Sequence, residues 1–260
     1  MDAIKKPVEL RSEYEAKGFV FSPPIIPAEI VGRVVPHMDA VLEGRYETGM
    51  KPHAVRFTPD DPPEKLRRIE QPHLCDSVIR RVLTNPLMGE WIAGLLDAKW
   101  LQVWATQLLV KPAGGKESGS VGWHQDQAYW PYWQGEVFTV WLAIGNVTEH
   151  AGPLHYVAGS HRWGLLQGTD AGRCDIAVQQ QNIDVPQEGK WEEVPVILPP
   201  GAFAVQHGYL LHGSGPNYSH EPRRSFLLHM RTEKSRPTAV NYYTEHLDNP
   251  LYAPVIFDEK

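Results

Sequence analysis

His124 and Asp126, within the run from Gly122 to Trp133, are the residues whose types and spacing most directly suggest chemistry. They are two positions apart, so on an extended segment both side chains leave the same face and can converge on one metal ion. A third ligand must come from elsewhere, and His212, at the start of the sequence His-Gly-Ser-Gly-Pro-Asn, is the candidate. Two histidines and one carboxylate leave one side of a metal open, which is the ligand set of non-haem Fe(II) oxygenases.

Arg223 lies eleven residues after His212, just before the apolar run Ser-Phe-Leu-Leu. A planar guanidinium at the mouth of an apolar strand can hold a carboxylate through two parallel hydrogen bonds and fix its orientation. A surface salt bridge is the alternative interpretation. Arg224 is expected on the opposite face of the sheet, because neighbouring side chains of a strand alternate.

Six segments, together with Arg223, closely resemble the phytanoyl-CoA dioxygenase family of iron and 2-oxoglutarate-dependent oxygenases. They cover about half of the chain in the expected order. The segments are Leu-Leu-Val-Lys-Pro (108–112), Trp-His-Gln-Asp (123–126), Tyr-Trp-Pro (129–131), Thr-Val-Trp-Leu-Ala (139–143), Gly-Ser-His (159–161) and His-Gly-Ser-Gly-Pro-Asn (212–217). The resemblance implies Fe(II) held by His124, Asp126 and His212, with 2-oxoglutarate and O2 as cosubstrates. It also implies hydroxylation, or occasionally desaturation, of a substrate with release of succinate and CO2.

The same resemblance implies contacts to 2-oxoglutarate. Arg223 stands at the family's interval after the distal histidine and would anchor the far carboxylate. The other contacts that carry over by position are Gln107, Trp141, Ser214 and, only through an alignment gap, Arg68. From the residues alone, Trp141 could equally be core packing and Gln107 a strand-edge amide.

Other ligands and other functions compete with this interpretation. His207 is the closest rival to His212 as the third ligand, although the favoured interpretation of His207 is a buried, hydrogen-bonded histidine of a strand. His155, His161 and His229 are interpreted as structural.

A cupin-like metal-binding protein without oxygenase activity is the alternative function, because zinc accepts the same ligands. Arg223 favours the oxygenase, since a simple binder has no use for a carboxylate anchor at that interval. Asp126 argues against a halogenase, whose family relatives lack this carboxylate.

Composition narrows the class of partner. The net charge is −6 and the pI is near 6.0, which argues against nucleic acid or an anionic membrane surface as a partner. The one basic cluster, Lys65 to Arg68, is short. We therefore expect a small-molecule substrate, no nucleic-acid partner and no membrane partner, and the oligomeric state is left open.

The cysteines and the N-terminus indicate the compartment. Cys75 and Cys174 lie far apart with no Cys-x-x-Cys pair, so reduced thiols are expected. The segment Met1–Lys6 lacks the apolar stretch of a signal peptide, and no run of about 18 apolar residues could span a bilayer. A cytoplasmic location is the default expectation.

The order of patterns predicts one oxygenase domain over residues 1–260, with a largely helical flank over about 1–99 and a jelly-roll core over about 100–235. This fold class is mainly β, a cupin-like double-stranded β-helix with N-terminal helices. Predicted helices cover 9–17, a segment from Pro27 that Pro36 should kink or restart, 76–83 and 86–96. Predicted strands cover 100–110, 137–147, 192–198, 202–206 and 224–231.

The sequence constrains the identity of the substrate less than it constrains the metal site or the fold. Trp123 should face away from the metal and pack in the core, whereas Tyr129 to Trp133 are expected in a loop at the mouth of the barrel. This predicts a largely apolar or ring-containing organic substrate. Arg56 and Arg67, from an irregular segment at 45–62 and its neighbour, could contact a carboxylate, although solvated charges are the simpler interpretation. The glycine-rich loop 111–121 is either a substrate rim or a turn, and the polar insert from about 166 to 189 carries no convincing motif.

Overall fold

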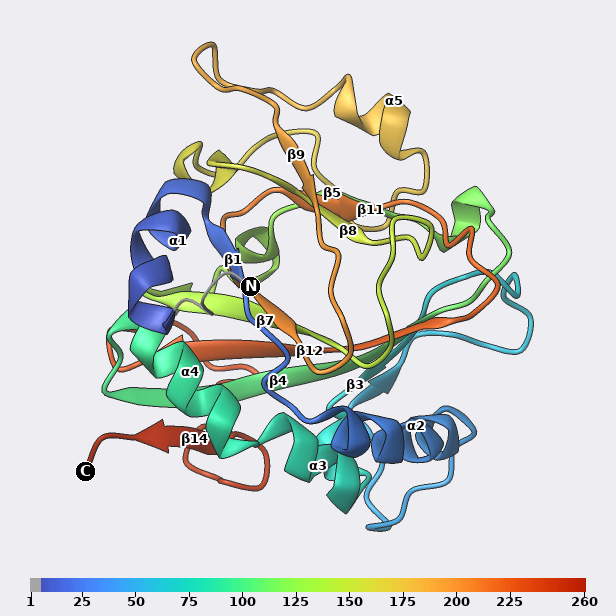
Figure 1. Ribbon diagram of the computed structural model, residues 1–260, viewed down its shortest axis with the longest axis vertical. Helices are drawn as coiled ribbons and strands as arrows, with labels where there is room; N and C mark the ends of the chain where they lie inside the picture. Colours follow the sequence, from blue (N-terminus) through green and yellow to red (C-terminus); the bar gives the residue numbers. More distant parts are fainter. Residues whose placement is uncertain (1–5) are drawn as a thin grey trace.

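A computed structural model describes residues 6–260. The expectation about a signal peptide concerned Met1–Lys6, of which residues 1–5 lie outside the described part. Two antiparallel sheets face each other as a jelly roll (Figure 1). The major sheet has the order β1 (Phe19–Phe21), β10 (Phe203–His207), β7 (Val137–Ala143), β12 (Arg223–Thr232), β4 (Trp100–Lys111), β3 (Arg67–Glu70) and β2 (Ala54–Val55), and β14 (Val255–Asp258) also pairs with β4. The minor sheet has the order β5 (Val121–His124), β11 (His212–Ser214), β8 (Leu154–Val157) and β9 (Glu193–Pro195). A small third sheet pairs β6 (Trp133–Gln134) with β13 (Arg236–Pro237).

The helices lie mostly in the N-terminal part of the chain, as predicted. They are α1 (Arg11–Lys17), α2 (Ala28–Leu42), α3 (Ser77–Leu83), α4 (Pro86–Leu96) and α5 (Ile176–Gln180), with short 3-10 helices η1 (Pro7–Leu10), η2 (Pro72–Leu74), η3 (Glu117–Gly119), η4 (Asp126–Tyr129) and η5 (Ser160–Arg162). Gly18 ends α1 with φ 84, a conformation that glycine adopts at little cost. The side chain of Asp76 caps α3 by accepting the backbone N–H groups of Val78 and Ile79.

Helix α2 contains Pro36 in its interior. The helix continues through this residue, so it does not restart there, and the kink stays a prediction. An interior proline costs about 3 kcal/mol. Burial of the apolar stripe on the same helix, at about 1.5–3 kcal/mol per side chain, outweighs that cost. The buried residues of the stripe are Val31, Val34, Met38 and Val41.

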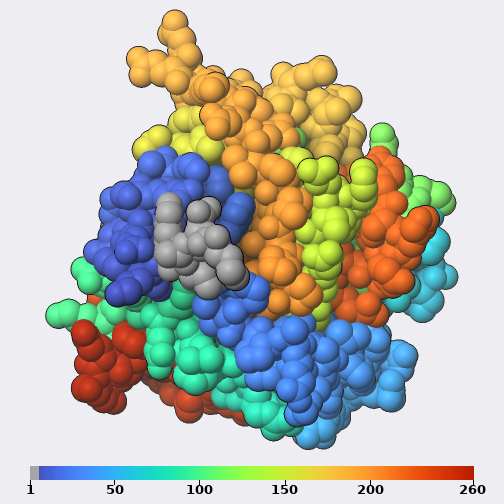
Figure 2. Space-filling view, in the orientation of Figure 1, coloured from blue at the N-terminus to red at the C-terminus, as the bar shows by residue number. Residues whose placement is uncertain are grey.

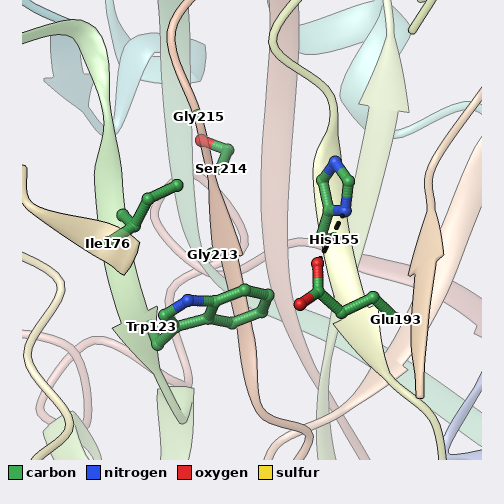
Figure 3. A pocket seen from close by; sticks show the side chains of 7 residues that line it. All are labelled: Trp123, His155, Ile176, Glu193, Gly213, Ser214 and Gly215. Atoms are coloured by element: carbon green, nitrogen blue, oxygen red, sulfur yellow. Dashed lines mark ion pairs between the residues drawn. The ribbon is translucent and has the colours of Figure 1, made fainter. Parts of the chain in front are cut away.

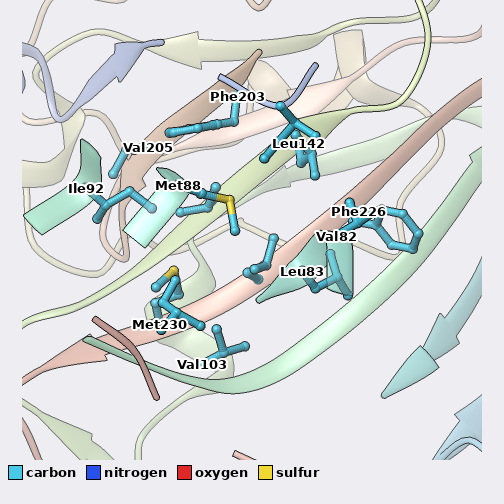
Figure 4. Close-up of a cluster of buried hydrophobic side chains, with 14 of the residues drawn as sticks. Val82, Leu83, Met88, Ile92, Val103, Leu142, Phe203, Val205, Phe226 and Met230 are labelled. Carbon is cyan, nitrogen blue, oxygen red and sulfur yellow. The ribbon is translucent and has the colours of Figure 1, made fainter. Parts of the chain in front are cut away.

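The main core lies between the major sheet and helices α2 to α4, which cover the face turned away from the minor sheet (Figure 1, Figure 4). Strand β12 supplies Phe226, Leu228 and Met230 to this core, all fully buried. Because side chains alternate along a strand, the residues between them point into the barrel. A shift by one residue would exchange the two faces, so burial of the core fixes which residues line the barrel interior.

The N-terminal flank is more than a cover. Strand β1 pairs with β10, and strand β3 pairs with β4, so residues before position 100 extend the major sheet at both of its edges.

The segment with α5 stands out from the body at the top of the space-filling view (Figure 2). Among residues 6–260, no helix has the length and apolar character needed to cross a membrane.

Candidate active site

The three predicted metal ligands meet at one point between the two sheets. His124 and His212 are directly opposite each other on the paired strands β5 and β11. Gln125 is extended, with φ −117 and ψ 126, so Asp126 returns to the same face as His124. The Nε2 atoms of both histidines lie 3.8 Å from Asp126 Oδ1, and ligand atoms of all three residues lie within 4.8 Å of one another.

Backbone hydrogen bonds fix the tautomer of each histidine. The Nδ1 atom of His124 lies 2.8 Å from the carbonyl oxygen of Gly122, and that of His212 lies 2.9 Å from the carbonyl oxygen of Leu210. A carbonyl only accepts, so each Nδ1 carries a hydrogen, and in the neutral form of each ring the lone pair is on Nε2. Burial, and then the charge of His212, lowers the pKa of His124 to about 3, so its ring is neutral near pH 7. Both rings are thus ready to bind a metal.

Asp126 is oriented by polar groups of the major sheet. Its Oδ2 accepts the Thr139 hydroxyl at 2.7 Å and the Gln206 amide at 3.1 Å, which leaves Oδ1 toward the histidines. Burial opposes its ionisation, yet the electrostatic effect of the neighbouring imidazoles of His212, His229 and His124 and the hydrogen bond from Thr139 together lower its pKa. A carboxylate and two imidazoles with supporting partners fit a divalent iron ion.

The residues that orient Asp126 were missed in the sequence. Thr139 and Gln206 are polar residues inside apolar strands, and that irregularity was the available signal. Behind them, Tyr156 donates its hydroxyl hydrogen to Gln206 at 2.6 Å, and His229 Nδ1 lies 3.0 Å from the Thr139 hydroxyl. His229 is therefore structural in the sense that it supports the carboxylate rather than the ion.

Arg223 points into the barrel from the start of β12, with 4% of its surface exposed. Its guanidinium lies 5.2 Å from the ring centre of Trp141, and one nitrogen donates to the carbonyl of Gly152. Its Nε has no hydrogen-bond partner, and burial lowers its pKa to about 10. Arg224 points the other way, as predicted, and pairs with Asp39 of α2 at 3.0 Å.

A buried guanidinium with an unpartnered nitrogen fits an incoming carboxylate. Leaving a buried donor unsatisfied costs about 1–3 kcal/mol, and more for a charged group. An acidic ligand would remove that cost. The surroundings of Arg223 therefore suit a carboxylate ligand.

The remaining predicted cosubstrate residues also lie on the inner face of the barrel, by strand register. Gln107 is opposite Leu227, next to Glu70, and its amide lies 3.4 Å from His229 Nε2. Ser214 is two residues beyond His212 on β11. Arg68 is partly exposed on β3, and its nearest acid is Glu70 at 4.0 Å.

The rival histidines do not join the metal ligands. His207 ends β10, where its Nδ1 accepts the backbone N–H of Tyr209 at 3.1 Å. His155 pairs with Glu193, and His161 contacts the carbonyl of Glu15. The structure therefore brings His212, and not His207, to His124 and Asp126.

Comparison with known proteins identifies the family. A family model for phytanoyl-CoA dioxygenase matches residues 14–225. The chain belongs to the phytanoyl-CoA dioxygenase family. Membership makes it an Fe(II)/2-oxoglutarate-dependent dioxygenase, as predicted, and sets aside the cupin-like protein without oxygenase activity.

Individual relatives of this phytanoyl-CoA dioxygenase family member are distant. A probable alpha-ketoglutarate-dependent hypophosphite dioxygenase from Stutzerimonas stutzeri is 26% identical over 85% of this chain and 76% of its own length. The human peroxisomal phytanoyl-CoA dioxygenase is 22% identical over 85% of this chain and 67% of its own length. Among solved structures, the epimerase SnoN with Fe3+, alpha-ketoglutarate and nogalamycin RO has a TM-score of 0.69 at 20% identity, covering 90% of this chain and 87% of that one. The structural likeness supports the jelly-roll fold.

The aromatic residues after Asp126 do not all lie where the sequence suggested. Trp130 and Trp133 are 5% and 4% exposed and pack with Trp104, so their placement at the mouth of the barrel was wrong. Their apolar area is better buried against Trp104 than exposed to water. Tyr129 is half exposed, and its ring centre lies 6.0 Å from that of His124.

Trp123 faces away from the metal, as predicted. It lines a cavity of about 110 Å³ on the outer face of the minor sheet, with His155, Glu193 and Ile176 (Figure 3). His155 and Gly213 are strand partners and share this outer face. The cavity is therefore separated from the metal ligands by the sheet itself.

The polar insert has a role that no sequence motif indicated. Residues 164–183, called here the clasp, bind the outer edge of β5. The amide of Gln179 accepts the N–H of Trp123 at 2.7 Å and donates to its carbonyl at 2.9 Å, as a neighbouring strand would. The Gly122 N–H donates to the carbonyl of Ala171 at 3.1 Å. The clasp thus holds the strand that presents His124.

Proposed function

We propose that this enzyme hydroxylates a C–H bond of a small organic, largely apolar or ring-containing substrate, while 2-oxoglutarate is converted to succinate and CO2. In this proposal His124, Asp126 and His212 hold Fe(II). Arg223 binds the distal carboxylate of 2-oxoglutarate, and Gln107, Trp141, Ser214 and Arg68 complete its surroundings. The bound iron supplies activation of O2 for the oxidation.

One observation carries the proposal. Three ligand atoms converge between the sheets, and the buried guanidinium of Arg223, with its free Nε, lies on the same inner face. Each histidine directs Nε2 toward Asp126 Oδ1, because its Nδ1 is hydrogen-bonded to a backbone carbonyl. Arg223 fixes the orientation of a dicarboxylic acid by binding the end that is not at the metal. A substrate C–H placed on the open side of the ion is then within reach of oxidation.

The substrate class rests on Tyr129. Its half-exposed ring beside His124 offers an apolar surface next to the ion. Its hydroxyl accepts the N–H of Ala171 at 3.0 Å, so the clasp holds the ring in place. Of the three proteins compared, two have an organic molecule in their names, and the third has hypophosphite. Desaturation is the alternative outcome at the same site.

The test measures oxygen-dependent succinate release with a panel of ring-containing organic acids and with hypophosphite. Mass spectrometry of ligands retained with Fe(II) and 2-oxoglutarate under anaerobic conditions would guide the choice of panel. Tyr129→Ala should lose the substrate-stimulated part of turnover and keep the uncoupled part. Tyr129→Phe, which keeps the ring, should retain most of both. Turnover stimulated by hypophosphite, or by a multiply charged molecule without an apolar body, would contradict this substrate class.

A further inference from the structure

Lys111 is a fully buried cation to which the family resemblance gave no role beyond its place in Leu-Leu-Val-Lys-Pro. It ends β4 and is the direct strand partner of Arg223 on β12, so both side chains enter the same end of the barrel. Its Nζ lies 2.6 Å from the Ser214 hydroxyl, 2.5 Å from the carbonyl of Gly215 and 3.4 Å from that of Ser214. An ammonium has three donors and no acceptor, so these three contacts use it completely.

The contact with Lys111 determines the direction of the Ser214 hydroxyl. The oxygen accepts from the ammonium, so its own hydrogen must point elsewhere. Ser214 lies on the inner face of β11, two residues from His212. The hydroxyl hydrogen is therefore free for an acceptor inside the barrel.

The charges at this end of the barrel are not balanced by the protein. Within the described chain, neither Lys111 nor Arg223 has an acidic side chain as an ion-pair partner. Burial, and then the charge of Arg223, lowers the pKa of Lys111 well below its ordinary value. Two neighbouring buried cations are costly unless an anion joins them. The end of the barrel is thus built for a bound negative charge.

We propose that Lys111 is a positioning residue for 2-oxoglutarate, which turns the Ser214 hydroxyl so that it donates its hydrogen to the distal carboxylate held by Arg223. This inference rests on the proposed function, because it assumes that Arg223 binds that carboxylate. Lys111 acts through Ser214 and does not itself touch the cosubstrate.

The experiment compares two keto acids on Fe(II)-loaded protein without oxygen. Binding of 2-oxoglutarate and of 2-oxobutanoate, which lacks the distal carboxylate, is measured by calorimetry. Lys111→Met and Ser214→Ala should each weaken 2-oxoglutarate binding by about 10- to 100-fold, the range for a hydrogen bond to a charged group. Binding of 2-oxobutanoate should not change. The double variant should be little worse than either single variant, because both remove the same hydrogen bond.

Three outcomes would overturn the inference. They are additive effects in the double variant, equal losses for the two keto acids, and unchanged 2-oxoglutarate binding in Lys111→Met. Ser214→Ala keeps every buried charge, so it carries the test if Lys111→Met does not fold. Arg223→Ala distinguishes a wrong cosubstrate site from a wrong role for Lys111. If Arg223→Ala weakens binding of the two keto acids equally, the proposed cosubstrate site is wrong. If Arg223→Ala weakens binding of 2-oxoglutarate alone and Lys111→Met does not, only the role of Lys111 is refuted.

Discussion

His124 and His212 are direct partners across the β5–β11 pair, with ring centres 4.1 Å apart. Strand pairing alone therefore sets the separation of two metal ligands that are far apart in the sequence. Asp126 then needs only one extended residue to reach them. The metal site is a property of the sheet register, and its precision depends on keeping that register.

Removal of any one ligand should abolish activity. We expect His124→Ala, Asp126→Ala and His212→Ala each to eliminate succinate formation and to weaken iron binding, because each leaves an incomplete ligand set. His207→Ala should retain both properties. Iron content after equilibrium dialysis and succinate release are the measurements, and normal iron affinity in the His212 variant with loss in the His207 variant would reverse the assignment.

Arg223→Ala should raise the 2-oxoglutarate concentration needed for half-maximal turnover by 10-fold or more, since a charge-assisted pair is worth about 1.5–3 kcal/mol. Arg224→Ala is the matched control, because its side chain pairs with Asp39 on the outer face. It should change the requirement by less than about 2-fold, as is typical of partly exposed ion pairs. Steady-state kinetics with varied 2-oxoglutarate would decide, and equal effects of the two variants would contradict the assignment.

Thr139→Val removes the hydroxyl that binds Asp126 while keeping the shape of the side chain. Loss of such a supporting bond to a metal ligand typically costs 10- to 100-fold in metal affinity. Thr106→Val is a suitable comparison, because Thr106 is also a buried strand threonine, but its hydroxyl contacts Gln71 Oε1 and His73 Nδ1 instead. It should lower the melting temperature without changing iron affinity. An unaltered iron affinity in Thr139→Val would mean that Gln206 alone orients the carboxylate.

Gly122→Ala should displace the clasp. A Cβ at this position would lie 2.1 Å from the carbonyl oxygen of Asp170, so one of the two segments must move. We expect a stability loss of about 1–3 kcal/mol and weaker iron binding, because β5 carries His124. Gly145→Ala, where nothing lies within 4 Å of the added atom, should be silent in both measurements. Thermal melting with and without Fe(II) makes the comparison.

His73 should make the fold sensitive to acid. Burial, and then the charge of Arg80, lowers its pKa from 6.5 to about 4. The unfolded chain therefore takes up this proton first, so the stabilisation is complete above pH 6.5 and is lost as the pH falls toward 4. The loss is ~3 kcal/mol at most. Urea unfolding at several pH values should show a shallower decline for His73→Gln than for the unchanged protein, whereas exposed His220→Gln should leave the decline as it is.

Much of the site could be predicted because it depends on local spacing. The pair His124 and Asp126 is separated by one residue, and strand alternation then fixes their common face. The same rule placed Arg223 and Arg224 on opposite faces correctly. These inferences need only the period of a strand and the assumption of a buried core.

Other features depend on long-range packing, which spacing does not encode. Trp133 could not be assigned to the core before Trp104 was known to lie beside it. The Gln179 side chain makes two hydrogen bonds with the backbone of Trp123, which is distant in the sequence. No residue near Gln179 in the sequence indicates this role. Lys111 is similar, since its partners Ser214 and Gly215 lie at the end of β11 and just after it, about a hundred residues later.

The clasp also affects how the protein behaves among its own copies. Strand β5 ends the minor sheet, and an uncovered strand edge is a template for pairing with another chain. The backbone of Gly122 and Trp123 is already bonded to the clasp, so that edge offers little to a second molecule. Loss of the clasp would therefore leave the backbone groups of β5 free to pair with another molecule. Because β5 also carries His124, self-association would accompany loss of iron.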